Sequence, residues 1–168
     1  YNDGPDTINY VRQICNDDTL RKKIFLRNGY LQITSDLTSE EIRRLKDMMN
    51  TIQLLVSENT PVSGFSVDLE PKAYDGKKVH LAYASAVPIG TYNNPDSISV
   101  IEVANIIMQA QYIAALKAAK NLGVNELFLM PLGGGVFKNK RRDIISNILF
   151  ALRNVDMSGI DVKLLTYR

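Results

Sequence analysis

The segment with the clearest chemical potential contains three consecutive glycines, Gly133 to Gly135, within the run from Leu129 to Asn139. An apolar, strand-like stretch precedes these glycines, and a helix-like stretch follows them. Glycine tolerates positive φ and lets the backbone approach a ligand closely. The start of the following helix offers N–H groups without helical partners and the positive end of the helix dipole. These features predict a binding site for an anionic group such as phosphate.

Basic side chains gather directly after the glycines, at Lys138, Lys140, Arg141 and Arg142. The whole chain of 168 residues has 20 Lys and Arg against 18 Asp and Glu, and this net charge of +2 is too small to indicate nucleic-acid binding. A local cluster beside a glycine loop favours a small anionic ligand instead. The same residues would also suit the solvated start of a helix, and the sequence leaves that alternative open.

The common catalytic and nucleotide-binding motifs are absent from the sequence. The glycines lack GxGxxG spacing and are not followed by Lys-Ser or Lys-Thr, which argues against dehydrogenases, kinases and P-loop nucleotide hydrolases. Metal-ligand spacings and nucleophile triads are also absent, so no metal is expected. The single His80 and the single Cys15 are interpreted as structural residues.

Two other segments place polar residues where a ligand can meet them. Pro88 and Tyr92 lie after an expected strand, in a segment that either contacts a ligand or forms an Asn-rich turn. Near the start of the chain, Asp3 and Asp6 stand three residues apart beside Gly-Pro. Their carboxylates could activate a water molecule or hold a ribose hydroxyl. Alternatively, Asp6 simply caps the following helix.

The elements that must position these segments fall into a helical region and an α/β region. Residues 6–58 predict helices, because apolar residues repeat at helical spacing and Thr38 with Glu41 has capping-box spacing. Within this region, residues 19–27 are expected to be helical up to Asn28-Gly29. Residues 59–78 are expected to be loop-like around one short β-prone piece. The rest alternates, with strands expected at 79–87, 126–132 and 162–167 and helices at 98–120 and around 144–152.

This alternation is typical of parallel strands joined by right-handed crossovers, with helices covering the sheet. The length suits one core, so we expect a single α/β domain over residues 1–168, with its helical region at 6–58 and its α/β region at 62–168. Three or four strands make a thin sheet for about five helices. We therefore expect further strands of the same sheet upstream of Tyr1.

The remaining composition bears on location and partners. No apolar run approaches the roughly 18 residues of a membrane span, so no membrane partner is expected. One Cys cannot form an internal disulfide, which fits a reducing compartment and predicts a cytoplasmic location, or the host cytosol for a secreted effector. Basic and aromatic residues do not interleave, so nucleic acid is not an expected partner either.

The run Gly133-Gly134-Gly135-Val136-Phe137-Lys138-Asn139 resembles the second ligand loop of macrodomains, which bind ADP-ribose. The Val79-His80 strand before a Pro-containing loop and the helix ending in Ala118-Ala119 are also similar to that family. Residues 2–8 resemble the end of the family's first loop. The long helical insert points to a divergent branch resembling poly(ADP-ribose) glycohydrolases.

The resemblance implies a three-layer α/β/α macrodomain fold with additional N-terminal helices, ADP-ribose or ADP-ribosylated protein as the partner, and no cofactor. It implies that the glycine backbone holds the diphosphate, that Phe137 meets the distal ribose and that Tyr167 lies near the adenine. The catalytic acids expected from it are Asp3 and Asp6. The predicted ligand-binding residues are Gly133, Gly134, Gly135, Val136, Phe137, Asn139, Pro88, Tyr92 and Tyr167.

The function expected from this resemblance is ADP-ribose binding with hydrolysis of an ADP-ribosyl linkage. Two alternatives stay open. One is a reader that binds ADP-ribose without turnover, and the other is an interaction domain whose glycine turn is only structural. The family's Asn-Ala-Ala-Asn segment and the Asp that usually holds the adenine have no counterpart in this sequence.

Overall fold

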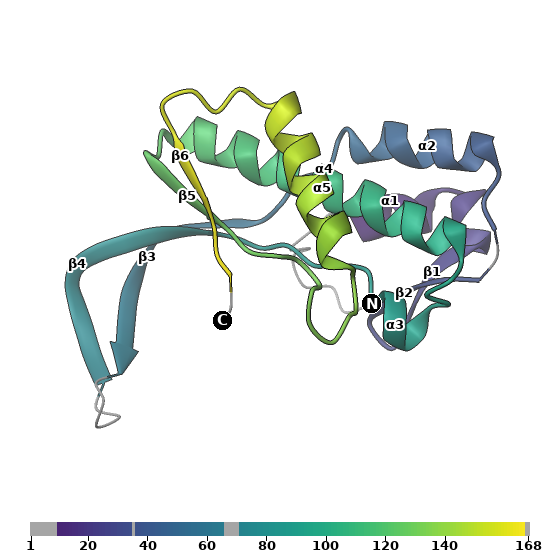
Figure 1. The fold of residues 1–168 in the computed structure, drawn as a ribbon, viewed down its shortest axis with the longest axis horizontal. Coiled ribbons are helices and arrows are strands. Elements are labelled where there is room, and N and C mark those ends of the chain that lie inside the picture. Colours follow the sequence, from purple (N-terminus) through teal and green to yellow (C-terminus); the bar gives the residue numbers. More distant parts are fainter. Residues whose placement is uncertain (1–9, 35, 66–70, 167–168) are drawn as a thin grey trace.

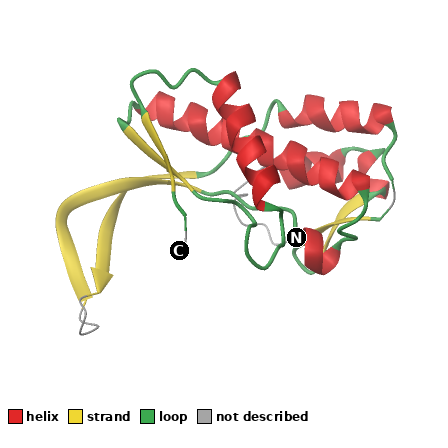
Figure 2. Cartoon of the chain, viewed as in Figure 1, coloured by secondary structure: helices red, strands yellow, loops and turns green. Residues whose placement is uncertain are grey.

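The computed structural model describes residues 10–34, 36–65 and 71–166 and shows a mixed α/β chain (Figures 1 and 2). The predicted residues Asp3, Asp6 and Tyr167 lie outside the described residues. The elements in chain order are α1 (Tyr10–Asn16), the 3₁₀ helix η1 (Leu20–Lys22), β1 (Ile24–Arg27), β2 (Tyr30–Ile33), α2 (Ser39–Met49), β3 (Val56–Phe65), β4 (Pro71–Ala82), α3 (Ile89–Tyr92), α4 (Ile98–Leu122), β5 (Glu126–Leu129), α5 (Arg141–Asn154) and β6 (Asp161–Leu164).

The described strands pair as three separate two-stranded sheets. β1 with β2 and β3 with β4 are antiparallel, whereas β5 and β6 are parallel, in register from Glu126 opposite Asp161 to Leu129 opposite Leu164. The predicted parallel pair joined by a helical crossover is therefore confirmed for β5, α5 and β6. Within the described part of the chain β4 is not hydrogen-bonded to β5, so the mixed α/β class is observed without one sheet between two helical layers.

The predicted α-helix over residues 19–27 is wrong, because the stretch holds only the short 3₁₀ helix η1 and then enters the β1–β2 hairpin at Ile24. Asn28 and Gly29 join the two strands with φ values of +52° and +80°. A two-residue turn with positive φ at both positions matches the twist of antiparallel strands, and Asn-Gly is a strong sequence signal for it. The capping box at Thr38 and Glu41 is confirmed, although α2 ends at Met49 instead of continuing toward Val56.

The predicted loop over residues 59–78 is also wrong, since β3 and β4 form a long hairpin that extends away from the helices (Figure 1). Pro61 lies at one end of an irregularity in the strand register, between Pro61 and Ser63. Such bulges let a strand accommodate residues that usually break strands. At the other end, β4 stops at Ala82, so residues 83–87 are not the strand that the sequence predicts.

Helix α4 runs through both hydrophobic clusters of the core. One cluster joins it to α1, α2 and the β1–β2 hairpin, and the other joins it to β5, α5 and β6. The helix begins after the Ser97 cap and ends at Gly123, which has a φ of +64°. It is the one helix among the described residues that is long and apolar enough to cross a membrane, with a mean hydropathy of 1.3. However, 56% of that apolar stretch is buried inside the protein, as is usual for a core helix.

A buried carboxylate, Asp17, connects the end of α1 to α2. Its side chain is 7% exposed, and it accepts hydrogen bonds from the Leu20 N–H at 2.9 Å, from the Thr19 N–H at 3.0 Å and from the Arg44 guanidinium. Burial acts to raise the pKa of Asp17. The hydrogen bonds outweigh this effect, so its pKa is held below the ordinary value of 3.8.

Because this pKa is lowered by folding, Asp17 stabilises the protein above pH 3.8, and the contribution is lost as the pH falls through the lower folded value. We expect Asp17→Asn to lower the free energy of unfolding at neutral pH by about 1.5–3 kcal/mol. The variant should also lose less stability than wild type as the pH falls below 3.8. Urea unfolding at several pH values measures both effects. Asp18→Asn is the matched control, because the Asp18 side chain is 84% exposed; an unchanged acid slope in Asp17→Asn would contradict the assignment.

Candidate functional site

The glycine loop, residues 131–140, connects β5 to α5 and contains most of the predicted ligand-binding residues. Gly133 has a φ of +71°, and a Cβ atom there would lie 2.5 Å from the Ala86 Cβ and even closer to the Asn139 amide nitrogen. Both the backbone conformation and the surrounding contacts therefore require glycine at this position. Gly133 packs the loop against the segment that follows β4.

Asn139 holds the loop in this position. The residue is buried, and its Nδ2 donates to the Val87 carbonyl at 3.0 Å and to the Gly133 carbonyl at 3.3 Å. Its backbone N–H donates to the same Gly133 carbonyl at 3.0 Å. The sequence predicts that Asn139 contacts a ligand; in this structure its side-chain amide joins two loops that lie about 50 residues apart in sequence.

The outer half of the loop faces solvent. A Cβ atom at Gly135 would meet nothing within 4 Å, and Val136 is 79% exposed. Gly134 is less tightly packed than Gly133 but less open than Gly135, because a Cβ atom there would come 3.2 Å from the Cδ1 of buried Ile144. The loop thus has an inner part that packs, at Gly133, and an outer part open to a ligand, at Gly135 and Val136.

Two polar residues of α4, neither of them predicted from the sequence, position the loops. Gln111 is fully buried, and its amide accepts from the Ser85 N–H and donates to the Ser85 carbonyl, both at 2.7 Å. The Gln111 side chain therefore satisfies both backbone groups of Ser85, as a neighbouring β-strand would. Gln111 lies within the apolar stripe of α4, and a polar residue at such a position was the available signal.

Tyr112 likewise forms hydrogen bonds with backbone groups at the start of the glycine loop. Its hydroxyl donates to the Met130 carbonyl at 2.8 Å and accepts from the Leu132 N–H at 3.0 Å. Burial raises the pKa of Tyr112 to about 12, although the Leu132 N–H acts in the opposite direction. The phenol therefore stays protonated at neutral pH and keeps its bond to Met130.

An aromatic cluster forms beside the glycine loop from three separate segments of the chain. Tyr92, at the end of α3, stacks on Tyr30 of β2 with ring centroids 4.2 Å apart and an interplanar angle of 14°. Phe137 of the glycine loop meets Tyr30 edge-on, with centroids 6.1 Å apart. The Gly90 N–H donates to the Phe137 carbonyl at 3.2 Å. The structure thus brings the predicted residues Tyr92 and Phe137 together and adds Tyr30, which was missed because its hairpin was interpreted as the end of a helix.

Asn93 ties the β1–β2 hairpin to this cluster. Its Nδ2 donates to the Leu31 carbonyl at 2.9 Å and to the carbonyl of buried Pro88 at 3.0 Å, and its Oδ1 accepts from the Ile33 N–H at 2.8 Å. Of the two interpretations of this segment, the Asn-rich turn describes Asn93. Pro88, expected as a ligand contact, contributes its backbone to this network.

The basic residues surround the N-terminus of α5. Lys140 precedes the first helical residue and makes no side-chain cap, and Arg141 and Arg142 follow it. The Arg142 guanidinium lies 3.3 Å from the carboxylate of Asp143, the acidic residue of the first turn. Cations at a helix N-terminus face the positive end of the helix dipole, which is unfavourable unless an anion lies between them. The local charge therefore favours an anionic ligand.

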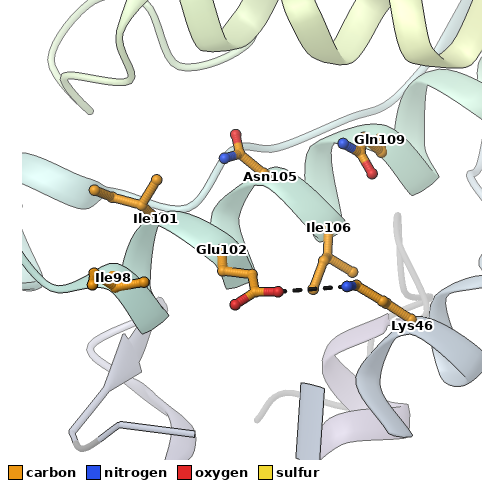
Figure 3. Close-up of a pocket in the computed structure, with 7 residues that line it drawn as sticks. All are labelled: Lys46, Ile98, Ile101, Glu102, Asn105, Ile106 and Gln109. Atoms are coloured by element: carbon orange, nitrogen blue, oxygen red, sulfur yellow. Dashed lines mark hydrogen bonds and ion pairs between the residues drawn. The ribbon is translucent and has the colours of Figure 1, made fainter. Parts of the chain in front are cut away.

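The glycine loop is not part of the two hollows that lie along α4. One, of about 500 Å³, is lined by residues of α4 with Lys46 of α2 and is bridged by an ion pair between Lys46 and Glu102 at 3.4 Å (Figure 3). The second, of about 440 Å³, continues along α4 toward Lys117 and Phe150. The polar side chains of Lys46, Glu102, Asn105 and Gln109 line the first hollow beside three isoleucines, whereas apolar side chains dominate the second.

In the part of the chain that the structure describes, no group of three His, Cys, Asp or Glu side chains lies together. Cys15 is a free, half-buried thiol, and His80 lies within β4 with its Nδ1 buried and unpartnered among the described residues.

Comparison with family models, curated proteins and solved structures found no match to this chain. The described geometry places a solvent-facing glycine loop beside the cation-rich start of α5 and the aromatic cluster of Tyr30, Tyr92 and Phe137.

Proposed function

We propose that the glycine loop binds ADP-ribose and that the protein hydrolyses an ADP-ribosyl linkage, releasing ADP-ribose from a modified protein or a simpler derivative. The observation that carries the binding proposal is the open apex of the loop at Gly135 and Val136, beside the cation-rich start of α5. The aromatic cluster at Phe137 adds a surface for the ring parts of such a ligand. The resemblance of residues 133–139 to a macrodomain loop supplies the identity of the ligand.

In the proposed hydrolysis the glycine loop binds the diphosphate, and an N-terminal carboxylate activates the attacking water. The loop immobilises the diphosphate, which fixes the position of the anomeric carbon of the distal ribose. Asp3 or Asp6 then orients a water molecule and accepts its proton while the bond to the leaving group breaks. The water oxygen forms the new bond to the anomeric carbon, and the leaving group takes up a proton. No cofactor takes part, and the cytoplasm is the proposed location.

The catalytic part of the proposal predicts that Asp3→Ala or Asp6→Ala reduces turnover of an ADP-ribosylated protein at least 100-fold, because general base catalysis typically contributes about 10²–10⁴-fold. ADP-ribose affinity should change little, since the diphosphate contacts remain. Release of ADP-ribose by the full chain, with Asp18→Ala as the control, measures turnover. Unchanged turnover in both variants would remove the carboxylates from the mechanism. If wild type binds ADP-ribose but releases none from the modified protein, the protein is a reader that binds ADP-ribose without hydrolysis.

A second candidate function, an interaction domain with a structural glycine turn, is favoured by one observation. Gly133 is needed for packing against Ala86 and Asn139 whether or not a ligand binds. This alternative predicts that a bulky, charged residue at solvent-facing Gly135 leaves the function of the protein unchanged. Variants of Gly135 therefore separate the two candidate functions.

A further inference from the structure

The Tyr30–Tyr92 pair is built into the structure by contacts that do not involve any ligand. The β1–β2 hairpin supplies Tyr30, and Asn93 connects that hairpin to α3 through three hydrogen bonds of 2.8–3.0 Å. The bond from the Gly90 N–H to the Phe137 carbonyl then connects α3 to the glycine loop. As a result, the rings are held at a fixed place relative to the loop.

The pair is not covered by the rest of the described protein. Tyr92 remains 39% exposed although one face of its ring stacks on Tyr30, and Tyr30 itself is only half-buried. The rings therefore present uncovered aromatic surface beside a loop suited to an anion. The Lys138 side chain lies against Gly90, so a cation also borders this surface. Aromatic faces beside phosphate-binding groups suit ligands in which a flat or apolar ring face adjoins phosphate.

We propose that Tyr30 and Tyr92 are specificity-determining residues that contact a ring of the ligand next to its diphosphate, so that the β1–β2 hairpin selects nucleotide-like ligands over simple phosphates. This inference rests on the proposed function of the glycine loop. The ring is either the adenine or the distal ribose, since both expose a face that packs on an aromatic side chain. The hairpin thus becomes part of the ligand site.

The test is a calorimetric titration of the full chain with three probes: ADP-ribose, ADP and inorganic pyrophosphate. Tyr30→Ala is expected to weaken ADP-ribose binding about 10-fold or more, because stacking contacts of this kind typically contribute 5- to 150-fold in affinity. Pyrophosphate affinity should not change. An equal loss for ADP identifies the adenine as the ring, whereas a loss for ADP-ribose alone identifies the distal ribose.

Two controls separate this inference from folding and from the proposed function. Tyr30→Phe retains the ring and should restore binding, and Phe150→Ala, which removes a 42% exposed ring from α5, should have no effect. Thermal unfolding followed by circular dichroism checks that Tyr30→Ala is folded. If ADP-ribose binds wild type and Gly135→Glu abolishes it while Tyr30→Ala does not weaken it, the inference is wrong and the proposed function stands. If wild type binds no probe, both are wrong.

Discussion

Replacing Gly135 by Glu is expected to weaken ADP-ribose binding at least 100-fold without unfolding the protein. The position has open space around it, because a Cβ atom there would meet nothing within 4 Å, and its φ is not in the left-handed region. Exposed substitutions of this kind usually change the free energy of unfolding by less than about 0.5 kcal/mol. The added carboxylate, however, would occupy the apex of the loop and repel the diphosphate.

Calorimetry with ADP-ribose and urea unfolding measure these two effects on the same samples. Gly135→Ala is the matched control, since it adds a methyl group without charge and should retain most of the affinity. Gly134→Glu is a poorer choice, because its Cβ atom already presses on Ile144 in the core. Full ADP-ribose affinity in a folded Gly135→Glu variant would show that the glycine loop has only a structural role. It would favour the interaction-domain alternative.

Replacing Gly133 by Ala is expected to have the largest effect on stability. An alanine at a φ of +71° is strained by about 1–2 kcal/mol. Its Cβ atom would also press on Ala86 and on the amide of Asn139. Overpacking of this kind typically costs about 1–3 kcal/mol, so the free energy of unfolding should fall by about 2–5 kcal/mol. ADP-ribose affinity should fall as well, because the loop can no longer rest on the segment that follows β4.

Urea unfolding of Gly133→Ala beside Gly159→Ala separates strain from overpacking. Gly159 has a φ of +83°, but a Cβ atom there would meet nothing within 4 Å. Gly159→Ala should therefore cost only the backbone strain, about 1–2 kcal/mol. Equal losses in the two variants would show that Ala86 and Asn139 do not confine Gly133.

The C-terminal half of the fold could be predicted from the sequence because its two helices, α4 and α5, are long and periodic and are separated by clear turn signals. The predicted helix over 98–120 is observed as Ile98–Leu122, and the predicted strand at 126–132 is observed as Glu126–Leu129. The Gly123 stop signal was correct because a left-handed residue ends the helix there. Local pattern is sufficient where each element buries one face.

The N-terminal half was harder to predict because its patterns are short. Leu20, Ile24 and Phe25 fit a helical spacing, but the Asn28-Gly29 turn sets a hairpin in which Ile24 pairs with Ile33. Pro61 and Gly64 predict a loop, whereas in the structure Pro61 lies at a register irregularity between β3 and β4, and Gly64 pairs regularly with Lys72. In both hairpins the structure is set by pairing between strands, and this pairing cannot be seen in the local pattern of one sequence.

The candidate site was predicted in part for a similar reason. Glycine spacing and local charge identified the loop, since those signals lie within ten consecutive residues. Gln111, Tyr112 and Tyr30 were missed because each acts on a segment that is remote in sequence. Asn139 was found, but its burial and its bond to Val87 give it a structural task that sequence spacing does not reveal.

The most direct test of the central claim is an NMR titration of the ¹⁵N-labelled full chain with ADP-ribose, followed through its backbone amide signals. We predict shifts that saturate with ligand and centre on Gly134, Gly135 and Val136 and on the first residues of α5. Smaller shifts should occur at Tyr30 and Tyr92. Shifts confined to the hollow around Lys46 and Glu102 (Figure 3), or no shifts at all, would contradict the assignment of the glycine loop as the ligand site.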